Sequence, residues 1–320
     1  MTTGITKWMV RGLLALGVGV ALAACSPPPA AVVFLVDTIA DTVDVAPGDG
    51  VCADANGDCS LRAAVMEANT DPAVTEIRLT GGTTYPLTIA GRGEDAAATG
   101  DLDLSQPVYV RANAPGGSGM ATIDAGGLDR VFETHGGPYH YFEGLLLTGG
   151  DPGLASGGAM AVHAGFVGVE DTRITGNTAG VDGGGIAVEG GSLWIEDSTI
   201  DDNSAVGYGG AVHSSRYTLL YQTTVADNQA FNSQVASLGN GDFRLVSSTF
   251  AGDDAAVGAV GSRVVFTNSV LETTGSDCQI IASVVESEGN NVVSDSSCGL
   301  AGPGDQVDDA LLKPLTDNGG

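Results

Sequence analysis

The chain has 320 residues, of which 49 are glycine and only 5% are aromatic, and its formal net charge at pH 7 is −27. A hydrophobic fraction of 43% excludes a disordered chain, because it supplies ample apolar surface to bury. The excess of carboxylates excludes nucleic acid as a partner, since binding it needs many Lys and Arg contacts, and leaves cations, neutral glycans and basic proteins.

The first 24 residues predict a bacterial lipoprotein signal peptide. Lys7 and Arg11 supply the positive start, and residues 13–24 form an apolar stretch too short to span a bilayer. The stretch runs into Leu-Ala-Ala-Cys at residues 22–25, which resembles the lipobox whose cysteine becomes acylated. We therefore expect lipidation of Cys25 to attach the chain to a lipid bilayer, with residues 25–31 as anchor and Pro-rich tether. An ordinary secretory signal with an incidental cysteine is the alternative.

The lipobox implies a compartment outside the cytoplasm. Ser26 follows the cysteine, and by resemblance to lipoprotein sorting this implies the outer membrane, with the domain facing the periplasm or the cell surface. Disulfides are the default outside the cytoplasm, so we pair Cys52 with Cys59 and Cys278 with Cys298. A zinc site made of all four is the alternative, but the Cys-x₂-Cys spacing typical of such sites is missing.

Residues 32–320 form the predicted folded domain, which starts with a strand pattern over residues 32–46 and an acidic turn. Asp54, Asn56 and Asp58 resemble the start of an EF-hand calcium loop. The match fails further on, because Cys59 stands where the loop needs Gly and Val65 where it needs Glu. A different calcium turn and a plain turn rich in Asp and Asn both remain open, so calcium is the one cofactor that the sequence suggests.

A short helix is predicted next, over residues 59–69, where it caps the domain. Ser60 is a good N-cap, and the helix has one apolar face made of Leu61, Ala64, Val65 and Ala68. This pattern places Arg62 and Glu67 off the buried face.

An internal repeat organises residues 157–228. Gly-Gly pairs recur at positions 157, 183 and 209, which are 26 residues apart, and each unit ends in an Asn, at 177, 203 and 228. We read each unit as one coil of stacked parallel strands. Like residues then lie above one another, and the Asn column forms a ladder at a turn. Three columns are predicted to point inward: Val167, Leu193 and Thr218; Val169, Ile195, Leu220, Leu245 and Val265; and Leu147, Ile174, Ile200, Val225, Phe250 and Val270.

The chain resembles secreted right-handed β-helix proteins that carry a CSLREA-type motif. The motif is matched by Cys-Ser-Leu-Arg-Ala-Ala-Val at residues 59–65, except at Ala63, where the family usually has Glu. The Gly-Gly-Ala and Asn repeats also resemble those of polymorphic outer-membrane protein passengers. The resemblance implies an all-β fold, a right-handed parallel β-helix of the pectin-lyase-like superfamily. It also implies that a C-terminal segment follows, because residues 311–320 resemble the stretch before the family's closing repeat.

The resemblance suggests carbohydrate chemistry, and carboxylates are the first candidates for catalysis. Many β-helix proteins are polysaccharide lyases or glycosidases, and a glycosidase needs two carboxylates about 5 to 9.5 Å apart. Such pairs are offered by equivalent positions of adjacent coils, Glu170 with Glu196 and Asp171 with Asp197. A solvated acidic edge is the competing interpretation. A lyase also needs a cationic base, and Arg173, Arg216, Arg244 and Arg263 are not predicted to converge.

Aromatic and histidine side chains are the candidates for binding. We expect His135, His140, Tyr139 and Tyr141 to form a substrate-binding patch, or else to cap a turn. The four histidines of the chain are not predicted to form a ligand set. No phosphate-binding glycine loop with Lys is present, so no nucleotide partner is expected.

Three functions therefore stay open. The first is a lipid-anchored surface display or adhesion module that binds a cell-surface glycan or protein. The second is a carbohydrate-active enzyme, a polysaccharide lyase or a glycosidase. The third is a calcium-dependent structural protein.

Overall fold

The computed structural model describes residues 30–113, 117–308, 310 and 312. The predicted signal peptide, the lipidation site Cys25 and most of the tether lie outside the described residues. So does nearly all of the segment 311–320.

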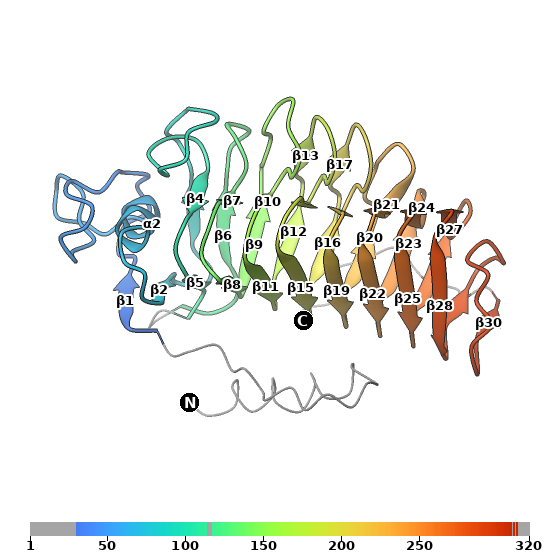
Figure 1. The fold of residues 1–320 in the computed structure, drawn as a ribbon. Coiled ribbons are helices and arrows are strands. Elements are labelled where there is room, and N and C mark those ends of the chain that lie inside the picture. Colours follow the sequence, from blue (N-terminus) through green and yellow to red (C-terminus); the bar gives the residue numbers. More distant parts are fainter. Residues whose placement is uncertain (1–29, 114–116, 309, 311, 313–320) are drawn as a thin grey trace.

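The described residues form a parallel β-solenoid, so the predicted β-helix fold is confirmed. Three parallel sheets run along it, and Figure 1 shows their strands stacked coil upon coil. We label these sheets A, B and C. From β4 to β29, each coil contributes one strand to each sheet, in the chain order C, A, B. Sheet A contains β1 (Val32–Leu35), β2 (Thr75–Arg78), β5 (Val108–Arg111), β8 (Tyr139–Glu143), β11 (Phe166–Glu170), β15 (Ser192–Glu196), β19 (Tyr217–Tyr221), β22 (Asp242–Val246), β25 (Arg263–Thr267) and β28 (Val284–Gly289).

Sheets B and C close the coil. Sheet B contains β3 (Thr84–Pro86), β6 (Ala121–Asp124), β9 (Leu145–Thr148), β12 (Arg173–Thr175), β16 (Thr199–Asp201), β20 (Thr224–Ala226), β23 (Thr249–Gly252), β26 (Val270–Thr273), β29 (Val292–Val293) and β30 (Gln306–Val307). Sheet C contains β4 (Leu102–Leu104), β7 (Phe132–Thr134), β10 (Met160–Val162), β14 (Ile186–Val188), β18 (Val212–Ser214), β21 (Ser233–Leu238), β24 (Ala255–Val260) and β27 (Cys278–Ile281). A short pair, β13 (Thr178–Ala179) and β17 (Ser204–Ala205), lies between them.

The predicted inward columns form the core as far as Phe250. Strand alternation buries Val167, Leu193 and Thr218 in register, and Ile174, Ile200 and Val225 in a second column. The assignment of Val265 and Val270 was wrong. Phe266 pairs with Leu245, and Leu271 pairs with Phe250, one residue later in each case. A one-residue change in strand register exchanges the two faces, so Val265 lies on the outer face, although it is buried there.

The predicted Asn ladder is present and fully buried. Asn177 donates from Nδ2 to Oδ1 of Asn203 at 2.9 Å, and Asn203 donates in the same way to Asn228 at 2.9 Å. Each amide also donates to a carbonyl of the preceding coil, such as Leu147, Ile174 or Ile200. The ladder therefore satisfies backbone groups at a corner where the strands end.

Helix α2 (Leu61–Ala68) covers the N-terminal end of the solenoid (Figure 1). Its N-cap is Ser60, whose hydroxyl accepts a hydrogen bond from the Ala63 amide, as predicted. The prediction that Arg62 and Glu67 lie off the buried face was wrong, since both side chains are buried. The buried Glu67 carboxylate accepts hydrogen bonds from the backbone amides of Gly48 and Gly50.

Both predicted disulfides, Cys52–Cys59 and Cys278–Cys298, are present. They tie down the two ends of the described domain, beside α2 and beside β27. Within the described part of the chain, no helix is long and apolar enough to cross a membrane.

Candidate functional site

Four of the predicted site residues lie on the outer face of sheet A. Glu170 and Glu196 are direct neighbours in β11 and β15, and Tyr139 and Tyr141 lie on the same face in β8. His140 alternates with them and therefore points into the core, where it is 1% exposed. Burial lowers the pKa of His140 to about 4, so the placement of this side chain in a surface patch was wrong.

Asp171 and Asp197 lie at the corners that follow β11 and β15. Both hold a left-handed backbone, with φ of 47° and 46°. Asp tolerates this conformation better than most residues, so a corner role accounts for carboxylates at these two positions.

A row of aromatic rings crosses part of sheet A, with one or two rings on each of the strands β5, β8, β11, β15 and β19. We call this surface the aromatic face; its half-buried rings are Tyr139, Phe166, Trp194, Tyr217 and Tyr221. Tyr109 and Tyr141 are buried beside them, with ring centroids 6.0 Å apart in an edge-on arrangement. The Tyr141 ring packs against the backbone of Gly168. A Cβ atom at residue 168 would lie only 2.9 Å from the ring. Phe166 and Trp194 meet edge to face at 6.4 Å.

Charged groups border the aromatic face along one side. The guanidinium of Arg111 lies 5.0 Å from the ring centroid of Tyr109 and 4.9 Å from that of Tyr141. Its Nε is 3.2 Å from Glu143, and Glu143, Glu170 and Glu196 stack in register. Burial raises the pKa of Glu143, and the Tyr141 hydroxyl donates to Glu170.

Two arginines converge on this sheet, contrary to the prediction. Arg263 lies 3.2 Å from Asp242, and Nε of Arg244 lies 3.7 Å from the same carboxylate. All three residues are outward members of neighbouring strands, β22 and β25. Arg173 is separate, because it pairs with Asp201 on sheet B at 2.5 Å.

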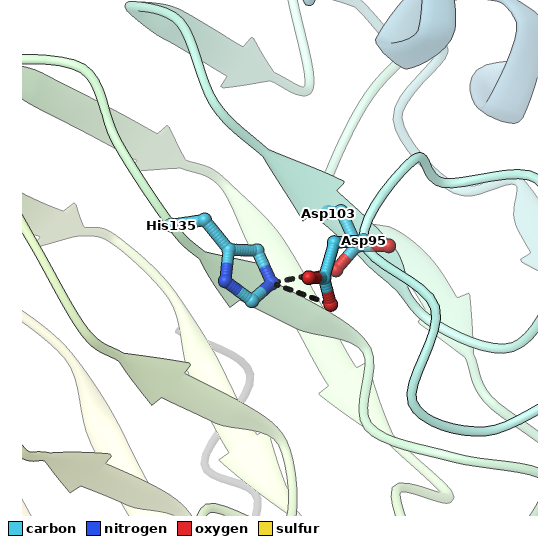
Figure 2. A group of neighbouring side chains, drawn as sticks. All are labelled: Asp95, Asp103 and His135. Atoms are coloured by element: carbon cyan, nitrogen blue, oxygen red, sulfur yellow. Dashed lines mark hydrogen bonds and ion pairs between the residues drawn. The ribbon is translucent and has the colours of Figure 1, made fainter.

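A second polar group lies on the outer face of sheet C, and of its members only His135 was among the predicted site residues. Asp103 in β4 and Glu133 in β7 are direct neighbours, and the imidazole of His135 faces Asp103 at 3.0 Å (Figure 2). His163, from the next coil, binds Glu133 at 2.5 Å, and its ring lies 5.6 Å from that of His135. The four histidines were not predicted to form a ligand set, and this meeting of His135 with His163 was not foreseen. We call Asp101, Asp103, Glu133, His135 and His163 the acid–histidine cluster.

The sequence holds one signal that points to this cluster. Asp103 stands between inward Leu102 and Leu104, and Glu133 follows inward Phe132 in the coil above. The signal is hard to read because Asp103 and Glu133 precede the regular repeat. Their coil lengths differ from 26 residues, so their register is not visible in the sequence.

Electrostatics in the cluster are dominated by burial. Loss of water, together with the charge of Asp103, raises the pKa of Asp101 to about 8. Loss of water also raises the pKa of Asp103 to about 6. The hydrogen bond that His163 donates to Glu133 raises the pKa of His163.

The turn at Asp54, Asn56 and Asp58, for which calcium and a plain turn were both left open, is held by hydrogen bonds to its own backbone. The Asp54 carboxylate accepts from the amides of Asn56, at 2.7 Å, and Asp58, at 3.1 Å. These hydrogen bonds lower the pKa of Asp54 and are typical of a turn rich in Asp and Asn. Among the described residues, the groups of acidic and histidine side chains close enough to share a cation lie elsewhere, in the acid–histidine cluster and at Asp95 beside it.

We expect the stability of the protein to fall as pH rises from 6.5 to 8 in chelator-treated buffer. Folded Asp101 keeps its proton up to about pH 8, whereas the unfolded residue loses it near 3.8, so the folded state binds more protons. His163, whose pKa is raised from 6.5, acts in the same direction. His140 and His213, whose pKa values are lowered by burial, oppose it near pH 6.5, and this opposition fades at higher pH as the unfolded imidazoles lose their protons.

For each additional proton that the folded state binds, a rise of one pH unit lowers the free energy of unfolding by up to about 1.4 kcal/mol. Denaturant titrations at several pH values across the range measure this slope, and Asp101→Asn should flatten it. An equal slope in the variant and the wild type would contradict the prediction.

Comparison of the chain with protein-family models, with curated proteins and with solved structures gives no match. The candidate sites therefore rest on the geometry of this chain alone.

Proposed function

We propose that this protein is a binding module of the bacterial cell envelope that holds a carbohydrate chain on its aromatic face. The observation that carries the proposal is that each strand of sheet A from β8 to β19 places at least one aromatic ring on the outer side, from Tyr139 to Tyr221. In an acidic, aromatic-poor chain, this concentration of rings on one sheet needs an explanation.

The arrangement suits an extended glycan. Rings of Tyr and Trp offer flat apolar area at their faces and a polar group at the edge, which matches a sugar ring with its C–H face and its hydroxyl rim. The rings repeat along the solenoid with the coil spacing of about 4.8 Å, so one chain can contact several of them. Arg111, Glu143, Glu170 and Glu196 supply hydrogen-bonding groups beside the rings.

The charge of the protein narrows the ligand class. A net charge of −27 disfavours polyanionic glycans and favours neutral or amine-bearing ones. The proposal places the domain on the outer membrane through lipidated Cys25. We also propose that the chain belongs to the right-handed β-helix proteins with a CSLREA-type motif. Such membership supports a surface role.

We expect Trp194→Ala to weaken glycan binding at least tenfold, because Trp194 lies centrally in the aromatic face beside Phe166. A glycan array with the tag-free domain, residues 30–320, identifies ligands, and calorimetry on the best of them measures the loss. Phe231→Ala is the matched control, since Phe231 is an aromatic residue 78% exposed on a distant loop. Binding that survives Trp194→Ala, or an array without any ligand, would remove the proposal.

A glycosidase is the second candidate, and one observation favours it. Glu143 and Glu170 are paired in register, and burial raises the pKa of Glu143, as a proton donor requires. The same glycans, incubated with the domain and analysed for shorter products, separate the two functions. Formation of shorter products would show that the protein is an enzyme and not a binding module.

A further inference from the structure

We propose that Asp101, Asp103 and Glu133, with His135 on their solvent side, bind a divalent transition-metal cation such as Mn²⁺ or Zn²⁺. One oxygen from each of the three carboxylates lies within 4.8 Å of the other two, and Asp95, Asp103 and His135 form an overlapping group. The cluster lies on sheet C, away from the aromatic face, so this inference is independent of glycan binding.

The three carboxylates come together from two coils. Asp103 and Glu133 are outward neighbours in β4 and β7, and Asp101 directly precedes β4. The loop before β4 lies against one side of the three carboxylates, because the Ala97 amide donates a hydrogen bond to Asp103 at 2.9 Å. The backbone there is fixed in turn by Arg62, which donates to the carbonyls of Ala97, Gly100 and Asp101. The carboxylates are thus held in place by the fold before any ligand arrives.

Asp101 is the residue that points to a missing partner. It is 1% exposed, and within the described structure its Oδ2 accepts no hydrogen bond. The nearest cationic group is NH1 of Arg130, which lies 3.8 Å from Oδ2 and is already 2.9 Å from Glu133. A buried carboxylate oxygen without a hydrogen bond is costly, and a bound cation removes that cost.

The charge of the cluster also calls for a cation. A divalent cation that binds here displaces the proton that Asp101 otherwise keeps. Asp101, Asp103 and Glu133 then surround the ion with three negative charges, and Arg130 supplies one positive charge that it shares with Asp129. The excess of two negative charges is balanced by the divalent cation.

The ligand set favours a transition metal over calcium. Ca²⁺ takes six to eight oxygen ligands, whereas imidazole nitrogens select Mn²⁺, Zn²⁺ and similar ions when they join carboxylates. Nε2 of His135 is 3.0 Å from Asp103 and 3.8 Å from Asp95 (Figure 2). It is also 3.9 Å from Glu133, so it is placed to share an ion with these carboxylates. His163 holds the other Glu133 oxygen at 2.5 Å and orients that carboxylate.

An ion can reach the cluster from the histidine side. The side chains of His135 and His163 are 28% and 32% exposed, and Asp95 is 75% exposed. Asp103, in contrast, is fully buried beneath them. Water can therefore fill the remaining coordination positions of the metal.

The test is metal binding to the tag-free domain, residues 30–320, first stripped with chelator. Titration with Mn²⁺, Zn²⁺ and Ca²⁺ by calorimetry should show about one equivalent of Mn²⁺ or Zn²⁺, bound more tightly than Ca²⁺, with a matching rise in the melting temperature. Asp101→Asn should weaken this binding at least tenfold. The variant should keep its fold, because the altered oxygen accepts no hydrogen bond in the described structure.

Glu288→Gln is the matched control, since it also changes one carboxylate to an amide, at an exposed position that accepts only from Thr267 in the described part of the chain. It should bind metal as the wild type does. Should Asp101→Asn fail to fold, Glu133→Gln tests the same site by the same titration. The proposal would be overturned if the wild-type protein bound none of the three ions or preferred Ca²⁺. It would also be overturned if a folded Asp101→Asn variant bound the metal as tightly as the wild type.

Discussion

Replacing Arg62 with Met is expected to lower the free energy of unfolding by about 3–5 kcal/mol, the largest effect of any single change considered for this chain. The Arg62 side chain is fully buried under the N-terminal end of the solenoid. It lies 2.6 Å from Asp41 and donates to three backbone carbonyls of the loop over sheet C. Met fills a similar volume but leaves Asp41 as an unpaired buried charge and the carbonyls without these donors.

Denaturant unfolding followed by circular dichroism measures this loss, with Arg216→Met as the control. Arg216 is exposed, and its side chain donates a hydrogen bond to the carbonyl of Glu189, so a change below about 0.5 kcal/mol is expected. The double variant Arg62→Met with Asp41→Asn should recover part of the loss, because much of the cost is the stranded charge. A loss in Arg62→Met no larger than in the control would show that this ion pair does not hold the cap.

Replacing Asn203 with Ala is expected to cost about 3 kcal/mol, because it removes the middle rung of the buried ladder. The Asn203 amide accepts from Asn177 and donates to Asn228 and to the carbonyl of Ile174. Alanine leaves buried groups of Asn177 and Ile174 without their partners, and each such group costs about 1–3 kcal/mol. Coils of a solenoid contact only their neighbours, so the damage should be greatest around β12 to β20.

Hydrogen exchange resolves this prediction along the chain, and chemical denaturation gives its total. Protection should fall around residues 174–228 and stay near the wild-type level around α2. Asn232→Ala is the control, since the Asn232 side chain accepts one hydrogen bond, from Ser233, and lies outside the ladder. Uniform loss of protection over the whole domain, or none at all, would contradict a local role for the ladder.

The amino-acid sequence by itself determined the coil architecture. A 26-residue period, inward apolar columns and a column of Asn are repeated signals, and each repeat confirms the register of the next. The same regularity predicted that Glu170 and Glu196 are neighbours on one sheet. The disulfides followed from local pairs of Cys, and the start of α2 from Ser60 at its N-cap. These features depend on neighbouring residues or on the period, so they can be read without coordinates.

Only the tertiary structure decided where the polar groups gather. Inward positions are constrained by the core, whereas outward ones can hold almost any residue, so the pattern says little about which of them meet. Asp103, Glu133, His135 and His163 come from coils of unequal length before the regular repeat, and the solenoid alone brings them together. The one-residue change in register at Phe266 was hidden for the same reason, because both Val265 and Phe266 are apolar. Burial of Arg62 likewise depends on a loop about 35 to 39 residues away, which no local pattern reveals.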